Sequence, residues 1–129
     1  MRLLILCAFL VLSCTTKIQT PNDIILGSWL YDKVGSLGDY SQNDKESKDE
    51  FDKSMTGKSL TFYKDHTYKA TVKKDGVESV LQSGKYEIKA DGKTMTMGNE
   101  KELKVFISDS AFKTYSPNNA CLVWRKIKD

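Results

Sequence analysis

The chain has 129 residues, 40% of them hydrophobic and 29% charged, which fits one globular domain with a modest core. Its 20 lysines and arginines against 17 acidic residues give a net charge of +3, and this small excess argues against a nucleic-acid partner. With a single histidine and three cysteines, we expect no metal site.

The first 13 residues have the organisation of a secretory signal peptide. Arg2 supplies a positive charge, Leu3–Leu12 form an apolar run, and the small residue Ser13 precedes the expected cleavage point. The run is shorter than the roughly 20 residues that a membrane-spanning helix needs. A buried N-terminal helix is the less favoured alternative, because the run has no amphipathic period.

The end of this run, Val11-Leu12-Ser13-Cys14, resembles the lipobox of bacterial lipoproteins. The resemblance implies cleavage before Cys14 and acylation, with palmitate among the acyl chains, of its sulfur and its new amino group. Several acyl chains anchor a protein stably, so the membrane is an expected partner. Residues 14–23 are then a lipidated, polar tether, and the protein is expected in the bacterial cell envelope, at the outer membrane.

These assignments leave one cysteine for the folded domain. Cys7 lies in the discarded apolar run and Cys14 carries lipid, so Cys121 has no partner for an intramolecular disulfide. Cys121 lies in the apolar stretch ACLVW, with no histidine or basic cluster beside it in sequence. We therefore expect a small packed hydrophobe rather than a reactive thiol.

From Ile24 onward the hydrophobic pattern has a period of two, which predicts β-strands. Eight strands are expected, at Ile24–Asp32, Lys58–Lys64, Thr67–Lys73, Val77–Lys89, Lys93–Gly98, Glu102–Ser108, Ala111–Tyr115 and Ala120–Lys128. All connections but the first are tight, so neighbouring strands are antiparallel. The sequence therefore predicts an all-β domain over residues 24–129, a small eight-stranded antiparallel up-and-down barrel, with a two-sheet sandwich as the alternative.

A long polar interval at residues 34–56 follows the first expected strand. Its apolar members Leu37, Tyr40, Phe51 and Met55 can cap the barrel or touch a ligand, although a mobile polar loop explains the interval equally well. The acidic stretch Asp44–Asp52 contains no glycine and is interrupted by lysines, so a solvated loop or short surface helix is favoured over a calcium site.

The only histidine, His66, lies in the expected turn between the second and third strands. Asp65-His66 fits a two-residue hairpin connection of type I′, and a type I turn with a bulge serves as well. The turn accounts for His66, which we therefore do not assign as a ligand or catalyst. No nucleophile–base pair or glycine-rich phosphate loop is recognisable, so we expect neither an enzyme nor a cofactor.

The expected strands also resemble those of the lipocalin-like lipoproteins of Bacteroidetes-type bacteria. The segments that carry the resemblance are Gly27-Ser28-Trp29, Ser59-Leu60-Thr61-Phe62 with Asp65 and Thr67-Tyr68, Gly84-Lys85-Tyr86-Glu87-Ile88, and Val123-Trp124-Arg125-Lys126. The resemblance implies a lipocalin-like barrel that is monomeric and binds a small, mostly apolar ligand in its mouth. His66 departs from the pattern, since the family usually has glycine at this position.

The resemblance also implies roles for particular residues. Gly27 and Trp29 would close one end of the barrel, with Arg125 across the indole ring as a cation–π partner. The candidate ligand cavity is lined by Tyr31, Phe62, Tyr68, Tyr86, Met95 and Met97. Because many inward residues are large, the alternative is a packed barrel that serves as an envelope interaction module and contacts protein or glycan.

Overall fold

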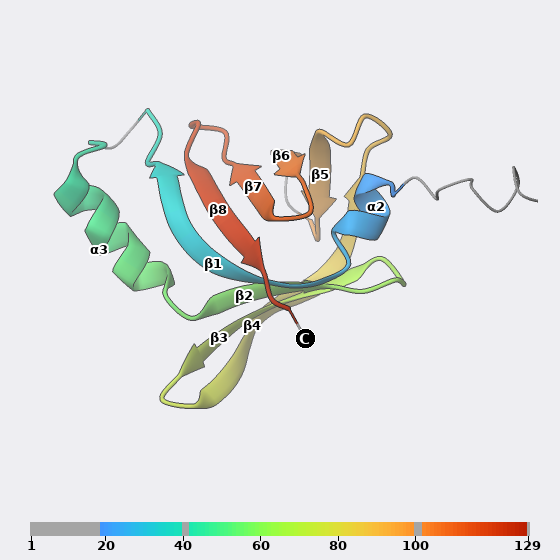
Figure 1. The fold of residues 1–129 in the computed structure, drawn as a ribbon, viewed down its shortest axis with the longest axis horizontal. Coiled ribbons are helices and arrows are strands. Elements are labelled where there is room, and N and C mark those ends of the chain that lie inside the picture. Colours follow the sequence, from blue (N-terminus) through green and yellow to red (C-terminus); the bar gives the residue numbers. More distant parts are fainter. Residues whose placement is uncertain (1–18, 40–41, 100–101, 129) are drawn as a thin grey trace, which may run out of the picture.

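A computed structural model describes residues 19–39, 42–99 and 102–128. The elements are α2 (Pro21–Ile24), β1 (Gly27–Ser36), α3 (Lys45–Met55), β2 (Lys58–Phe62), β3 (Thr67–Lys74), β4 (Val77–Ile88), β5 (Thr94–Met97), β6 (Leu103–Ile107), β7 (Ala111–Tyr115) and β8 (Cys121–Lys126). Each strand pairs with the next in antiparallel fashion, and β8 pairs with β1, so the sheet closes (Figure 1). The predicted all-β, eight-stranded up-and-down barrel is therefore confirmed, and the sandwich alternative is not.

The predicted signal peptide and Cys14 lie outside the described residues. Within the described ranges, no helix has the length and apolar character required to span a bilayer.

The first strand is displaced from its predicted position. β1 begins at Gly27 rather than Ile24 and continues past Asp32 to Ser36. Its pairing with β8 shifts register twice, between Tyr31 and Lys33 and again between Val34 and Ser36. Such bulges break the two-residue alternation and keep Val34 buried although it lies three residues after the buried Tyr31.

A short helix replaces the last part of the predicted tether. The Thr20 hydroxyl accepts a hydrogen bond from the Asp23 N–H at 3.3 Å, while an Asp23 carboxylate oxygen accepts from the Thr20 N–H at 3.2 Å. This is a capping box, and Pro21 occupies the first helical position, where a missing N–H is harmless. Residues 21–23 of the predicted tether are thus helical and belong to α2, which lies at one end of the barrel (Figure 1).

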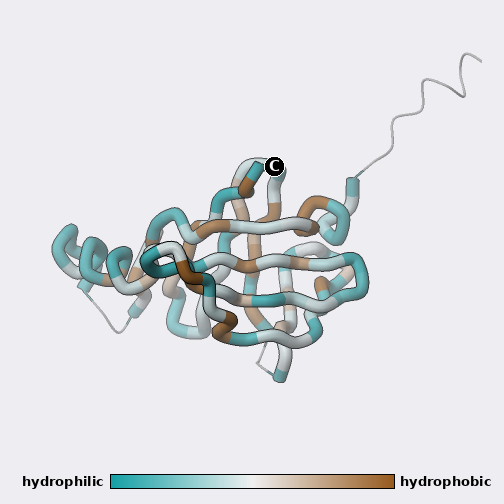
Figure 2. The backbone as a smooth tube through the Cα atoms, turned by 90° about the horizontal axis from the view of Figure 1, so that it is seen from below, coloured by the Kyte–Doolittle hydropathy of each residue, from teal (hydrophilic) through white to brown (hydrophobic). Residues whose placement is uncertain are grey.

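The interval at 34–56 is likewise not a plain loop. Its first residues belong to β1, and its second half is α3 (Figure 1). Asp44 caps this helix by accepting a hydrogen bond from the Ser47 N–H at 2.8 Å. Figure 2 shows α3 as largely hydrophilic, in agreement with the surface-helix interpretation of the acidic stretch.

The turn between β2 and β3 takes the second of the two predicted forms. The Tyr63 N–H donates to the Thr67 carbonyl and the His66 N–H to the Tyr63 carbonyl, so the loop holds three residues and not two. His66 has a φ of 66°, the left-handed conformation that ends a type I turn with a bulge. The β3–β4 turn is the type I′ hairpin instead, with Asp75 and Gly76 both at positive φ.

Candidate functional site

Trp29 closes the end of the barrel that lies beside α2. Its side chain is fully buried, and the indole N–H donates to the Ile25 carbonyl at 2.8 Å. Its ring lies 5.7 Å from that of Phe112 on the opposite wall. Trp29 therefore joins the helix end to both sides of the barrel.

The cation over this indole is Lys126, not Arg125 as the resemblance implied. The Lys126 ammonium lies 5.0 Å from the ring centroid, and it also donates to the carbonyls of Ile24, at 2.9 Å, and Leu26. Trp29 and Lys126 are register partners, whereas Arg125 pairs with Leu30 and points outward. The assignment of Arg125 to the plug is corrected for this reason of strand parity.

Gly27 leaves room for a neighbouring side chain, which is that of Lys126. A Cβ on Gly27 would meet Lys126 Cε at 3.4 Å, and the glycine has a φ of +108°. The lysine side chain therefore crosses the strand at a position that has no side chain of its own. Its ammonium places a positive charge at the carbonyl end of α2, where a cation is stabilising.

The six residues predicted to line a ligand cavity all point into the barrel and are buried. They are Tyr31, Phe62, Tyr68, Tyr86, Met95 and Met97. Phe62 lies at their centre: its ring is 5.0 Å from that of Tyr86, 5.8 Å from Phe112 and 6.4 Å from Tyr68. These side chains contact one another across the barrel axis and so form a hydrophobic core.

The other end of the barrel is covered by α3. Phe51 and Met55 of α3 are partly buried against the core, and the Phe51 ring lies 6.5 Å from that of Tyr31. Asp52 makes the polar attachment, since one carboxylate oxygen accepts from the Tyr31 hydroxyl at 2.7 Å and from the Val34 N–H at 2.9 Å. Three successive residues of α3 thus have different roles. Phe51 packs against the core, Asp52 accepts hydrogen bonds from β1, and Lys53 is exposed to solvent.

The environment of Tyr31 is unfavourable to its ionised form. Burial, the hydrogen bond to Asp52 and the negative charges of Asp52 and Asp32 all raise the pKa of Tyr31 well above its ordinary value. The Tyr31 hydroxyl therefore stays protonated and remains a donor to Asp52 throughout the physiological range.

Two glycines fix the segments on either side of α3. Gly38 has a φ of +84°, and an added Cβ would lie 2.3 Å from the Asn118 carbonyl oxygen. Gly57 has a φ of +86°, and its Cβ would lie 2.6 Å from the Lys73 carbonyl oxygen. Only glycine allows these close backbone approaches, which bring both segments against neighbouring turns.

The two residues that could have carried chemistry are not brought together. His66 lies in the β2–β3 turn, where its ring is exposed and 5.6 Å from that of Tyr86. Cys121 begins β8, is partly buried and lies against Gly35. Among the described residues, no group of three histidine, cysteine or acidic side chains has a spacing suited to a metal ion.

The sequence pattern did not reveal the open edge of β4. Among the described residues, only Tyr86, Glu87 and Ile88 pair with β5, and residues 77–84 pair with β3 alone. Val77, Val80 and Leu81 on this part of β4 are 67%, 58% and 53% exposed. The resulting hairpin projects from the barrel at the end remote from α2 (Figure 1).

A search of protein-family models and of curated proteins finds no match to this chain. The features that define the candidate site are accordingly geometric: a core of apolar side chains in mutual contact, a mouth covered by α3, and a strand edge with apolar side chains that has no partner strand among the described residues. The packed core and the covered mouth favour recognition at the outer surface over a ligand held inside the barrel. The edge of β4 is a surface on which a partner can bind.

Proposed function

We propose that the chain is a lipid-anchored, lipocalin-like module of the bacterial cell envelope that binds a partner protein through its outer surface. The packed core is the observation that carries this proposal, because the side chains expected to surround a ligand contact one another instead. The protein is not assigned an enzymatic step.

An anchor on Cys14 would orient the barrel relative to the membrane. Five residue steps separate Cys14 from Gln19, and they reach at most about 18 Å. The end with α2 would therefore face the lipid, while α3 and the β3–β4 hairpin lie at the remote end (Figure 1). Anchoring is tested by fractionation, with wild type expected in membranes and Cys14→Ala in the soluble fraction. Recovery of both in the soluble fraction would contradict it.

The β4 edge suits an extended segment of the partner. In the two-residue hairpin Lys74 and Val77 exchange hydrogen bonds, and alternation then directs the N–H groups of Glu78 and Val80 away from β3. A partner strand can pair with these groups and cover Val77, Val80 and Leu81.

The edge is tested by a photo-crosslinking residue in place of Glu78, with Lys33 on β1 as the control position. We expect a crosslinked partner from position 78 only, and its loss when Val80→Pro removes the outward N–H. Ser79→Pro is the comparison for unfolding, because the Ser79 N–H bonds to β3: it should raise amide hydrogen exchange in the hairpin, whereas Val80→Pro should lose the crosslink and leave that exchange unchanged. Crosslinks that survive Val80→Pro would exclude strand pairing. A crosslinked dimer would identify a second copy as the partner.

A small apolar ligand at the mouth is the second candidate function. The observation in its favour is that Phe51 and Met55 sit over the core on a helix whose only described hydrogen bonds to the barrel run through Asp52. Displacement of α3 would expose an apolar floor. Native mass spectrometry of the purified protein, with Asp52→Asn to loosen α3, is expected to detect a bound small molecule if this function is correct and the bare polypeptide if it is not.

A further inference from the structure

The outer face of β6, β7 and β8 carries an unbalanced positive charge. Inward positions on these strands are occupied by buried Val105, Phe112, Thr114 and Trp124, so the alternate residues point outward. The outward residues are Lys104, Phe106, Ala111, Lys113, Tyr115, Cys121, Val123 and Arg125. They include three cations and no carboxylate, and the two ion pairs formed among the described residues involve none of them.

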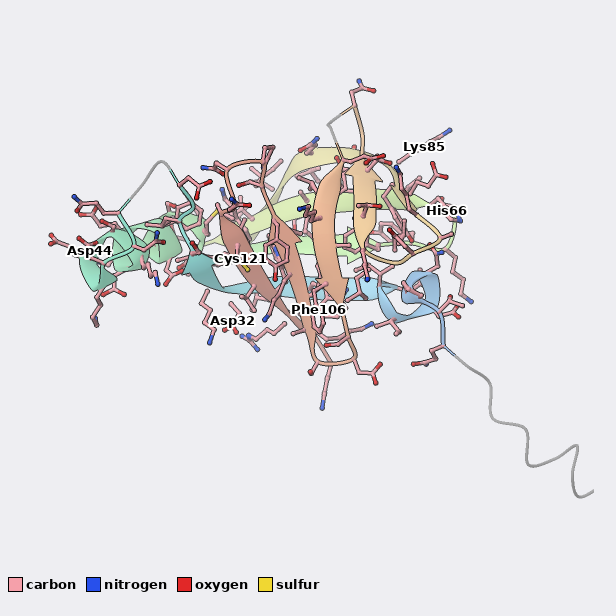
Figure 3. All side chains as sticks on the ribbon, turned by 90° about the horizontal axis from the view of Figure 1, so that it is seen from above. Asp32, Asp44, His66, Lys85, Phe106 and Cys121 are labelled. Atoms are coloured by element: carbon pink, nitrogen blue, oxygen red, sulfur yellow. The ribbon has the colours of Figure 1, made fainter. Side chains whose placement is uncertain are left out.

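The register places these residues in rows. Lys104 pairs with Thr94 on one side and with Tyr115 on the other, and Phe106 pairs with Lys113. Directly opposite residues on one face have Cβ atoms about 5 Å apart. Lys104 therefore stands between a hydroxyl and an aromatic ring, with Phe106 two positions along the same strand. Figure 3 looks onto this wall, on which Phe106 and Cys121 are labelled.

A groove opens on this face because β5 is short. β5 begins at Thr94, after the turn at Asp91 and Gly92, and within the described ranges it pairs with β6 at two positions. No β5 side chain stands beside Phe106, which is 50% exposed. The depression measures about 550 Å³ and is lined by Lys93, Thr94, Lys104, Val105, Phe106, Tyr115 and Asn119.

The lining has the character of a site for an amphipathic anion. Phe106 and Tyr115 supply apolar surface, and the Lys113 ammonium lies 5.5 Å from the Phe106 ring centroid, where it restrains the ring. Lys93 and Lys104 supply positive charge at the rim. The Thr94 hydroxyl, below this lining, is buried with no hydrogen-bond partner among the described residues.

We propose that this groove binds a small carboxylate with an apolar body, such as a medium-chain fatty acid. The apolar body lies along Phe106 and Tyr115, and the carboxylate lies between Lys93 and Lys104. The volume is in the range of small-molecule sites. The site is on the outer wall, so it is independent of the β4 edge and of the barrel mouth.

The test is a titration of the full-length chain, followed by amide chemical shifts, with octanoate, 1-octanol and octylammonium at low salt. Octanoate is expected to shift the signals of Lys104, Phe106 and Tyr115, to bind at least fivefold more tightly than octanol, and to weaken at 300 mM NaCl. Equal affinity for the three probes would overturn the charge argument. Shifts confined to α3 and the mouth would overturn the location.

Variants separate the site from general electrostatic attraction. Lys104→Gln is expected to lower octanoate affinity about fivefold, and Phe106→Ala to lower it for octanoate and octanol alike. Lys69→Gln, an exposed outward lysine on β3, is the matched control and should leave binding unchanged. Equal losses in Lys104→Gln and Lys69→Gln would contradict the proposal. Binding to vesicles of anionic phospholipid without any binding of octanoate would likewise overturn it, in favour of a membrane-contact surface.

Discussion

The Tyr31 hydroxyl donates to the Asp52 carboxylate at 2.7 Å, and this contact joins α3 to the wall of the barrel. The same carboxylate oxygen accepts from the Val34 N–H, so a single side chain of α3 serves two successive inward positions of β1. Apolar contacts of α3 with the core come from Phe51 and Met55. The position of the helix therefore depends strongly on Asp52.

Tyr31→Phe should loosen α3 without opening the barrel. The variant removes a hydrogen bond to a charged group, and such bonds contribute roughly 1.5–3 kcal/mol. We expect a loss near 1.5 kcal/mol in the free energy of unfolding, because Asp52 keeps its bond from Val34. Urea denaturation gives the loss, and amide hydrogen exchange should rise in α3 more than in β3. Uniform exchange throughout the chain would contradict a local role.

The raised pKa of Tyr31 predicts a pH dependence at the alkaline side. A tyrosine whose pKa is higher in the folded than in the unfolded chain contributes stability below the unfolded value of 10.0 and loses it as pH rises above that value. We expect the stability of wild type to be flat through neutrality and to fall above pH 10. In Tyr31→Phe the free energy of unfolding should fall less steeply above pH 10, by up to about 1.4 kcal/mol per pH unit. Burial also raises the pKa of Tyr86 and Tyr115, so some slope should remain. Identical slopes would exclude Tyr31 as a contributor.

Gly57→Ala and Gly76→Ala form a matched pair that isolates the backbone contact beside α3. Both glycines have positive φ, but a Cβ at Gly57 would lie 2.6 Å from the Lys73 carbonyl oxygen, while a Cβ at Gly76 meets nothing within 4 Å. Both variants should lose about 1 kcal/mol to backbone strain. Gly57→Ala should lose a further 1–3 kcal/mol, because the Lys73 N–H to Gly57 carbonyl bond is displaced. Thermal unfolding midpoints measure both, and equal shifts would show that the turn relaxes freely.

The strands of the second half were predictable because their patterns are local. Alternation places Tyr86 and Ile88, and likewise Met95 and Met97, on one face, and all four are buried. β1 was predicted less well, since its two bulges depend on pairing with β8, which lies about 90 residues away in the sequence. Its start lies at Gly27 and not at Ile24, because the capping box of Thr20 and Asp23 begins a helix that includes Ile24.

The mouth and the open edge depend on long-range geometry that no local pattern contains. α3 has few apolar residues, and its position is decided by the meeting of Asp52 with Tyr31. The edge of β4 is open because β5 is short, and not because of any residue in β4 itself. The error at Arg125 was avoidable, because the inward side chain of Trp124 already implies by alternation that Arg125 points outward and Lys126 inward.

The contact of Trp29 with Lys126 predicts a non-additive pair of substitutions. Lys126→Met keeps the aliphatic stem and removes the ammonium, and with it the cation–π contact and the bonds to the Ile24 and Leu26 carbonyls. A cation–π contact contributes about 0.5–2 kcal/mol, and each hydrogen bond to a charged group adds to the loss. We expect Lys126→Met to lower the free energy of unfolding by about 2–3 kcal/mol.

The exposed Arg125 provides the control for this pair. Arg125→Gln should change stability by no more than about 0.5 kcal/mol, since Arg125 faces outward on the neighbouring position of the same strand. Trp29→Phe combined with Lys126→Met should lose less than the sum of the single losses, because each variant removes the same indole–ammonium contact. Strict additivity would mean that Lys126 acts only through the carbonyls of Ile24 and Leu26. A larger loss in Arg125→Gln than in Lys126→Met would restore Arg125 as the plug residue.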